Sequence, residues 1–366
     1  MGFLYPTKTL YLHQQTHCLN PGTGFLKNID PTSAATAFSQ ITDDIYQVRL
    51  PLPFALRIVN CYLVRDKNGW CIVDTGLHVP PARVVWRETF DSLKIAPGDV
   101  TKIVLTHCHP DHFGMAGFLL KWIEEASGKT PSIFVAPGEW KTAMRVFTPH
   151  PNLESTLRQY FIECGVPQDD SNPILRSLGV LRGATKPHPE TVEHLQAGEK
   201  IEIGERVFQI IHTPGHSDNH LIFYDQSDQL VLCGDHVLQK ITPNIGLWPA
   251  SAPNPLEKYL TSLNALLKLE IRLALPGHGP IIRDWHGRIR EILLHHDERL
   301  QTMKNAVDAG RRTPFEVCEK VFETEELTAH EIRFAIAESL SHLEYLRESG
   351  ELKRRDGATM QYFPAN

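Results

Sequence analysis

The sequence predicts a layered α/β fold, and three observations carry this prediction. Segments with the two-residue alternation of β-strands recur up to about residue 285. Segments with helical spacing stand between them, which is the order typical of sheets covered by helices. The chain has 366 residues, 42% of them hydrophobic, so it is long enough for a large core and for two domains.

The first regular segments are three strands and a helix. Residues 1–40 have weak periodicity, and we treat them as an N-terminal extension without an assigned role. The segment 44–49 alternates between apolar and polar residues, as a half-buried strand does. Strands at 58–65 and 70–74 follow, joined by an Asp-Lys-Asn-Gly sequence that suits a hairpin turn. Residues 80–93 have helical spacing, with proline in the first turn.

The middle of the chain is predicted to be mainly helical. We expect a helix at 113–125, a strand at 132–136, and two or three helices separated by prolines within 139–181. Residues 256–269 have the apolar stripe of an amphipathic helix, and 284–309 read as a long charged helix.

Four potential metal ligands stand together after an apolar strand, namely His107, His109, Asp111 and His112. In an extended chain, residues two apart face the same side, so His107 and His109 can share one ion. Asp111 and His112 lie at the turn into the next helix and can reach a second ion close by. Imidazole and carboxylate are ligands of zinc, iron or manganese. The alternative is a solvated histidine-rich loop, and we favour the metal site.

Further ligands are available after three later apolar runs. His216 follows the run at 207–211, Asp235 follows the run at 230–234, and His278 follows the run at 271–275. Each lies beside glycine, which lets backbone approach a crowded centre closely. The chain also holds 19 histidines, which suits a metal protein.

The order of these ligands resembles that of the metallo-β-lactamase-fold superfamily, over residues 41–285. The resemblance implies an αββα sandwich with two divalent metal ions at its edge, zinc foremost and iron or manganese as alternatives. It also implies that Asp74, in an early Asp-Thr-Gly turn, supports the ligands; a plain turn residue is the alternative. The implied ligand sets are His107, His109 and His216 for the first ion, and Asp111, His112 and His278 for the second, with Asp235 bridging them.

For several segments around this centre, two roles are possible. The helices within 139–188 are expected to form a lid over the metals, and a plain surface elaboration is the alternative. In the loop 235–249, Asn244 and Trp248 are candidates for substrate contact, while the alternative makes His236 and Trp248 buried structural groups. His295 and His296 are expected on a solvated or inter-domain face rather than among the ligands.

The region 286–366 is predicted to form a long helix and a winged-helix-like domain. A short helix at 314–322, a longer one at 328–348 and a hairpin at 351–363 resemble a winged-helix domain, as seen in one branch of the superfamily, the lactamase-like proteins that include a single-strand-preferring endoribonuclease. Glyoxalase II-like proteins share the ligands, but their usual helical tail differs from this one. Its basic residues would bind single-stranded RNA in one interpretation. In the other, which we favour, the tail closes the pocket or makes a homodimer. The basic residues are Lys353, Arg354 and Arg355.

Composition limits the class of protein. A net charge of -6 argues against a nucleic-acid-binding surface over the whole chain. The seven cysteines include no Cys-x-x-Cys pair and are typical of reduced thiols in a cytosolic protein. We see no signal peptide and no apolar run near the ~18 residues of a membrane span, so we expect a cytoplasmic protein without membrane contact.

The predicted function is hydrolysis. Two ions a few ångström apart can share one water and lower its pKa, and the resulting metal-bridging hydroxide would attack an ester, thioester or related small-molecule substrate. Asp111 would orient the hydroxide and pass its proton onward. The alternatives are a phosphodiesterase or endoribonuclease acting on single-stranded RNA, and a non-catalytic nucleic-acid-binding protein.

Overall fold

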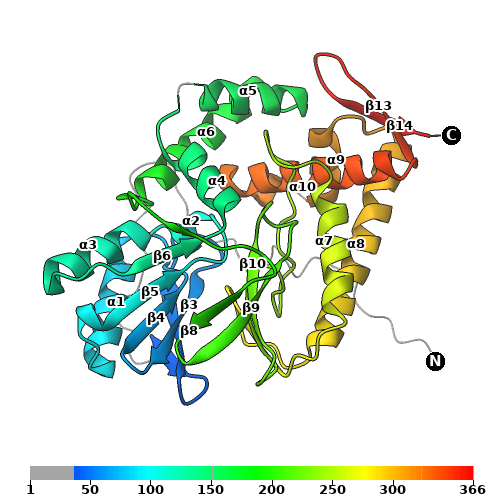
Figure 1. The fold of residues 1–366 in the computed structure, drawn as a ribbon. Helices are drawn as coiled ribbons and strands as arrows, with labels where there is room; N and C mark the ends of the chain where they lie inside the picture. The colour runs from blue at the N-terminus through cyan, green and yellow to red at the C-terminus, as the bar shows by residue number, and fades with distance from the viewer. Residues whose placement is uncertain (1–36, 151, 323, 366) are drawn as a thin grey trace.

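The computed structural model describes residues 37–150, 152–322 and 324–365, so the predicted N-terminal extension lies outside the described residues up to position 36. Two sheets face each other, with helices on both outer sides (Figure 1). This is the four-layer αββα sandwich that the sequence predicted.

The first sheet has its strands in chain order, β1 to β7. Strands β1 to β4 are antiparallel neighbours, and β4 to β7 are parallel. The predicted early strands correspond to β2, β3 and β4. The short edge strands β1 and β7 were not predicted. The strands are β1 Phe38–Gln40, β2 Ile45–Pro51, β3 Ile58–Asp66, β4 Gly69–Val73, β5 Val100–Val104, β6 Ser132–Val135 and β7 Glu193–His194.

The second sheet has the order β12-β11-β10-β9-β8, with β11 and β12 parallel and the other neighbours antiparallel. The apolar runs before His216, Asp235 and His278 contain β9, β11 and β12. Strand β10 was missed because it is buried along its whole length and therefore shows no alternation. The strands are β8 Lys200–Ile203, β9 Arg206–His212, β10 Leu221–Asp225, β11 Leu230–Gly234 and β12 Leu273–Pro276.

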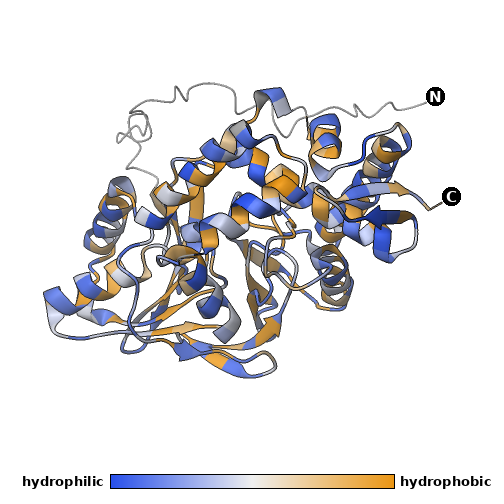
Figure 2. Cartoon of the chain, turned by 90° about the horizontal axis from the view of Figure 1, so that it is seen from above, coloured by the Kyte–Doolittle hydropathy of each residue, from blue (hydrophilic) through white to orange (hydrophobic). Residues whose placement is uncertain are grey.

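Ten α-helices cover the sheets and the edge between them in the described part of the chain. The region predicted as a lid contains α4, α5 and α6. Seen from above, the helices carry both hydrophobic and hydrophilic residues, as expected when only one face is buried (Figure 2). The helices are α1 Pro80–Leu93, α2 Pro110–Phe113, α3 Ala116–Ser127, α4 Pro137–Phe147, α5 Leu153–Glu163, α6 Gln168–Gly183, α7 Pro255–Leu266, α8 Trp285–Asp308, α9 Pro314–Phe322 and α10 Ala329–Glu348.

The helix predicted at 113–125 is present as α3, but its predicted start is wrong, because a break separates α3 from the short helix α2. The break brings the chain against the Asp-Thr-Gly turn. The Met115 amide donates to the Gly76 carbonyl at 2.8 Å, and a Cβ on Gly114 would lie 3.0 Å from that oxygen. A continuous helix would lose this contact, which fixes the segment holding Asp111 and His112.

Alternation along the strands separates three hydrophobic clusters. On β3, Leu63 belongs to the cluster under α1 and α3, whereas Val64 belongs to the cluster between the sheets. On β10, Phe223 faces the other sheet, whereas Ile222 belongs to a cluster shared with α7 and α8. This last cluster continues into α9 and α10, so the C-terminal helices share a core with the second sheet.

The C-terminal part ends in a hairpin of β13 Leu352–Arg355 and β14 Gln361–Pro364, close to the predicted one. Helix α10 begins after Thr328, whose hydroxyl accepts from the Glu331 amide while Glu331 reaches back, forming a capping box. In Figure 1 this helix lies across the top of the sandwich. In the described ranges, every helix is too short or too polar to cross a membrane.

Candidate metal centre

All seven predicted ligands meet at one edge of the sandwich. Four of them follow β5, His216 lies in the loop between β9 and β10, and Asp235 and His278 directly follow β11 and β12. Strands β4 and β5 are parallel, as are β11 and β12, so each pair delivers its following loops to one edge. The loops of the two sheets are joined there, because the Leu221 amide donates to the Thr106 carbonyl at 3.0 Å.

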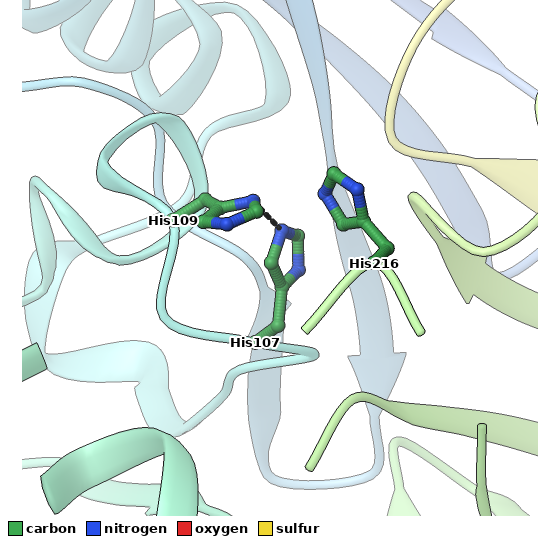
Figure 3. A group of neighbouring side chains, drawn as sticks. All are labelled: His107, His109 and His216. Atoms are coloured by element: carbon green, nitrogen blue, oxygen red, sulfur yellow. Dashed lines mark hydrogen bonds between the residues drawn. The ribbon is translucent and has the colours of Figure 1, made fainter. Parts of the chain in front are cut away.

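The first group consists of His107, His109 and His216, whose rings turn toward one another (Figure 3). His107 Nε2 lies 3.0 Å from His109 Nδ1. Two nitrogens that bind one tetrahedral zinc at 2.0–2.1 Å are about 3.3 Å apart. The spacing of these rings therefore suits a shared ion.

The second group consists of Asp111, His112 and His278. His278 Nε2 lies 3.2 Å from Asp111 Oδ2, and His112 Nε2 lies 4.0 Å from the same oxygen. Asp235 stands between the groups. Its Oδ2 is 3.3 Å from both His112 Nε2 and His278 Nε2, and 3.6 Å from His216 Nε2.

The outer nitrogens of three ligand rings are held by protein acceptors. His216 Nδ1 donates to the Asn244 carbonyl at 2.9 Å, and His278 Nδ1 donates to the Ile58 carbonyl at 2.7 Å. His112 Nδ1 lies 2.8 Å from Asp74 Oδ2. Because a carbonyl only accepts, His216 and His278 must carry the proton on Nδ1 and present the Nε2 lone pair to the centre when neutral.

The centre contains buried polar atoms without hydrogen-bond partners. They are the Nε2 atoms of His112, His216 and His278 and the Oδ1 atom of Asp235. Buried acceptors without partners are costly in an ordinary core, because they lose their bonds to water. The three Nε2 atoms converge on Asp235, within 3.3–3.6 Å of its Oδ2 atom, and this donor set is the one expected for zinc or a similar divalent metal.

The electrostatics differ between the two ligand groups. Burial, followed by the neighbouring rings, lowers the pKa of His107 well below its usual value. Burial opposes the charged form of His278 as well, yet Asp235 and Asp111 raise its pKa to about 10. The same carboxylates raise the pKa of His112. The carboxylates of Asp111 and Asp235 thus favour positive charge beside them, which suits a bound cation.

Asp74 supports the ligands and is not a plain turn residue. It is 2% exposed and has a left-handed backbone with φ of 57°, which is uncommon for a residue with a side chain. Its carboxylate accepts from the amide and hydroxyl of Thr106, both at 2.8 Å, and also holds His112. The Thr106 hydroxyl lies 2.9 Å from His107 Nδ1, so Asp74 orients ligands of both groups.

Glu139 is a supporting residue that the sequence analysis missed. It is 1% exposed in the first turn of α4. One oxygen accepts from the Cys108 amide at 2.8 Å, and the other accepts from the Ser217 hydroxyl and the Asn219 amide, both at 2.8 Å. It therefore ties the loop of His107 to the loop of His216. In the sequence, Glu139 is an acidic residue at the start of a helix, and such residues are common on protein surfaces, so nothing distinguished it.

His220 was also missed. It is fully buried, and its Nε2 accepts from the Asp235 amide at 3.2 Å. The Thr213 hydroxyl lies 3.0 Å from its Nδ1. A histidine inside a strand-forming sequence gave no pattern that linked it to the ligands.

The loop after Asp235 connects the centre to α10. The side-chain amide of Asn244 donates to Glu338 Oε2 at 2.8 Å and to the Phe334 carbonyl at 3.2 Å, so it is engaged by α10. His236 is fully buried, with Nε2 2.8 Å from the Ser262 hydroxyl, which agrees with the structural alternative. Trp248 is partly buried and packs against Phe334 with ring centroids 6.0 Å apart.

The fold and this centre define a class of αββα proteins with a histidine- and aspartate-rich metal site, and the comparisons with known proteins agree. The profile of the metallo-β-lactamase superfamily matches residues 55–278, and that of the metallo-β-lactamase-like C-terminal domain matches 300–364. A metallo-β-lactamase family protein of Thermus thermophilus with a crystal structure is 32% identical, with a TM-score of 0.78 over 89% of this chain and 100% of its own.

Two curated relatives extend the comparison. A probable metallo-hydrolase of Bacillus subtilis is 24% identical over 318 residues, which is 83% of this chain and 92% of the relative. An atrochrysone carboxyl ACP thioesterase of Cryptosporiopsis is 22% identical over 309 residues, covering 79% and 76%. The chain belongs to the metallo-β-lactamase superfamily and is a hydrolase of that superfamily, as the sequence predicted.

Proposed function

We propose that the chain is a dinuclear metal-dependent hydrolase of an ester, a thioester or a related small molecule. The supporting observation is the convergence of the buried Nε2 atoms of His112, His216 and His278 on Asp235, which joins the two groups of candidate ligands. His107, His109 and His216 would hold one ion, and Asp111, His112 and His278 would hold the other, with Asp235 between them. Zinc is the proposed metal, and iron and manganese are the alternatives.

The thioester class draws on the thioesterase name of the fungal relative, which is a distant one. When bound, two divalent ions would supply an activated water and positive charge opposite the oxygen of the scissile carbonyl. Among the ligands with ion-pair contacts, Asp111 has the most exposed side chain, at 14%. It is therefore the ligand best placed to orient the activated water and to pass its proton to the leaving group.

A metal analysis followed by a substrate screen tests this function. We expect two ions per chain and turnover of thioesters or esters in a panel that also contains lactones, phosphodiesters and single-stranded RNA. The control is Asp111→Asn, which should fold, weaken binding of the second ion because Asp111 is one of its proposed ligands, and lower kcat by about a hundredfold or more. Turnover of RNA alone would support the nuclease alternative, and a metal-free, inactive protein would support the non-catalytic one.

We also propose roles for the helices around the centre and for the C-terminal hairpin. Helices α4 to α6 and α10 would shape the pocket, because Glu139 on α4 joins the ligand loops and α10 holds Asn244. The winged-helix interpretation of α9, α10 and the hairpin is kept as a proposal, in a packing role. Arg354 is engaged by Glu344 at 2.8 Å and by Asp356 at 2.9 Å, which leaves little free charge for RNA.

A cytoplasmic location is also proposed, because the described cysteines are buried free thiols that suit a reducing compartment. These are Cys61, Cys71, Cys108, Cys164, Cys233 and Cys318. Cys18 lies outside the described residues.

A further inference from the structure

Helix α10 contains a buried arginine without an acidic partner among the described side chains. Arg333 is 7% exposed, and its Nε atom has no hydrogen-bond partner. Its Nη2 atom lies 3.4 Å from His330 Nδ1, a long contact with a neutral ring. Burial alone lowers the pKa of the guanidinium, to about 9. A buried charge without a counter-ion is destabilising, so its presence calls for a partner that the described chain does not supply.

The contacts of His330, one turn earlier on α10, connect this region to the loop that holds a ligand of the second group. Its ring stacks on Phe54, with centroids 4.9 Å apart and planes 7° apart. Burial and Arg333 lower the pKa of His330 to about 3, so the ring is neutral and does not compete with Arg333 for an anion, while Asp111 opposes this shift. Phe54 lies in the loop before Ile58, whose carbonyl holds the ligand His278.

Aromatic rings line the other side of Arg333. The guanidinium lies 3.9 Å from the centroid of the Phe334 ring and 5.7 Å from that of Trp248. Trp248 belongs to the loop that follows Asp235, and the same loop is hydrogen-bonded to α10 through Asn244. The wall beside the metal centre is therefore aromatic, with one positive charge in it.

We propose that Arg333 binds a carboxylate group of the substrate, at a distance from the ester or thioester carbonyl that reacts at the metal centre. The proposal rests on the proposed hydrolase function and adds a substrate class to it, an acyl compound with a second, free carboxylate. A guanidinium presents two parallel donors that match a carboxylate. One cation beside a neutral His330 balances a single negative charge, whereas a phosphate would bring nearly two.

A matched pair of thioesters tests the proposal. The S-adipoyl and S-hexanoyl thioesters of N-acetylcysteamine have the same chain length and leaving group and differ in the terminal carboxylate. We compare kcat/KM for both in the wild-type protein, in Arg333→Gln and in Arg333→Lys. Arg347→Gln is the control, because Arg347 is on the same helix but already paired with Glu344 at 2.9 Å.

We expect Arg333→Gln to lower the adipoyl-to-hexanoyl ratio of kcat/KM by about tenfold to a hundredfold, mainly through KM, as removal of a charged hydrogen bond does. Arg333→Lys should recover part of the ratio and Arg347→Gln should not change it. Metal content should stay the same in all variants. An equal loss for both thioesters, or loss of metal, would show a structural role and overturn the proposal.

Two measurements do not depend on turnover. Adipate titrated into the metal-loaded protein should bind at least tenfold more weakly to Arg333→Gln than to the wild type; equal affinity, or preference for inorganic phosphate over adipate, would overturn the proposal. The Tm of Arg333→Gln should be equal to or higher than that of the wild type, because an uncompensated buried charge is removed. If adipate binds as expected but no compound of the substrate panel is hydrolysed, the hydrolase assignment fails while the anion site is retained.

Discussion

Buried charged side chains have partners in the metal centre but not on α10. In the centre, both carboxylates face several histidines, and three ligand rings have an outer nitrogen held by a protein acceptor. On α10, Arg333 is equally buried and has no carboxylate beside it among the described side chains. If both proposals hold, the αββα sandwich holds the catalytic metal centre, and α10 binds the carboxylate of the substrate.

The largest expected effect comes from breaking the centre. Replacing His107 and His109 together by alanine removes two of the three nitrogens of the first group and should eliminate its ion. Loss of metal assistance costs several kcal/mol of transition-state stabilisation, so kcat/KM should fall by about a thousandfold or more. Elemental analysis and thioester hydrolysis measure the two effects.

The control for this double variant replaces His150 and His194, which are exposed and distant in sequence from the ligands. It should keep both ions and full activity. Retained metal and activity in the His107 and His109 variant would contradict the assignment of the first group.

The second prediction concerns how α10 is fastened to α8. His342 Nδ1 donates to the Glu338 carbonyl at 2.8 Å, so a neutral His342 accepts from His296 Nδ1 at 3.1 Å. Burial lowers the pKa of His342 to about 3 and that of His296 to about 2. The unfolded rings have a pKa near 6.5, so their contribution to stability is complete above pH 6.5 and is lost as the pH falls toward the folded values.

Each ring should add about 1.4 kcal/mol per pH unit to this acid sensitivity. Replacing both histidines by glutamine should therefore remove up to about 4 kcal/mol of the stability change between pH 6.5 and pH 5. Denaturant unfolding at both pH values measures the difference. Equal pH slopes in the wild type and the variant would mean that the pair does not stay neutral in the folded protein.

The third prediction weakens the centre without removing a ligand. Glu139→Gln replaces one carboxylate oxygen with an NH2 group, which cannot accept a hydrogen bond. Glu139 would then lose bonds from Cys108, or from Ser217 and Asn219, and the loops of His107 and His216 would be joined less firmly. Changes of this kind cost about tenfold to a hundredfold in metal affinity. Competition with a chelator measures the affinity, and Glu125→Gln on the surface of α3 is the control. An unchanged dissociation constant would show that the loops hold their positions without this carboxylate.

The layered α/β fold, the seven candidate ligands and most long helices could be predicted because each leaves a local pattern, whereas the αββα arrangement came from the family resemblance. The ligands follow apolar strands, and α1 was predicted with the bounds that the structure shows. The residues that orient the ligands leave no such pattern. Glu139 reaches the centre from a helix start, and Asn244 acts through its backbone carbonyl. Arg333 looked like an ordinary helix residue, because its environment is made by segments distant in the chain.

The smallest expected effect is on the free energy of unfolding, and it should differ between Arg354, which has acidic partners, and Arg333, which has none among the described side chains. Arg354 is 30% exposed and forms one of three polar contacts to Glu344, the others coming from Arg347 and Tyr362. Arg354→Gln should therefore lower the free energy of unfolding by less than about 1 kcal/mol, whereas replacement of Arg333 should not lower it.

The pH dependence of this small effect has a definite sign. Burial raises the pKa of Glu344, but the hydrogen bonds from Arg347, Tyr362 and Arg354 outweigh it and the net pKa is lowered. The contribution of the pair is thus present above the ordinary carboxyl pKa of 4.5 and disappears as the pH falls through the folded value. The wild type and Arg354→Gln should differ at pH 7 and converge in acid. A difference that persists in acid would mean that Arg354 stabilises the hairpin by packing and not by its charge, and it would remove the contrast with Arg333.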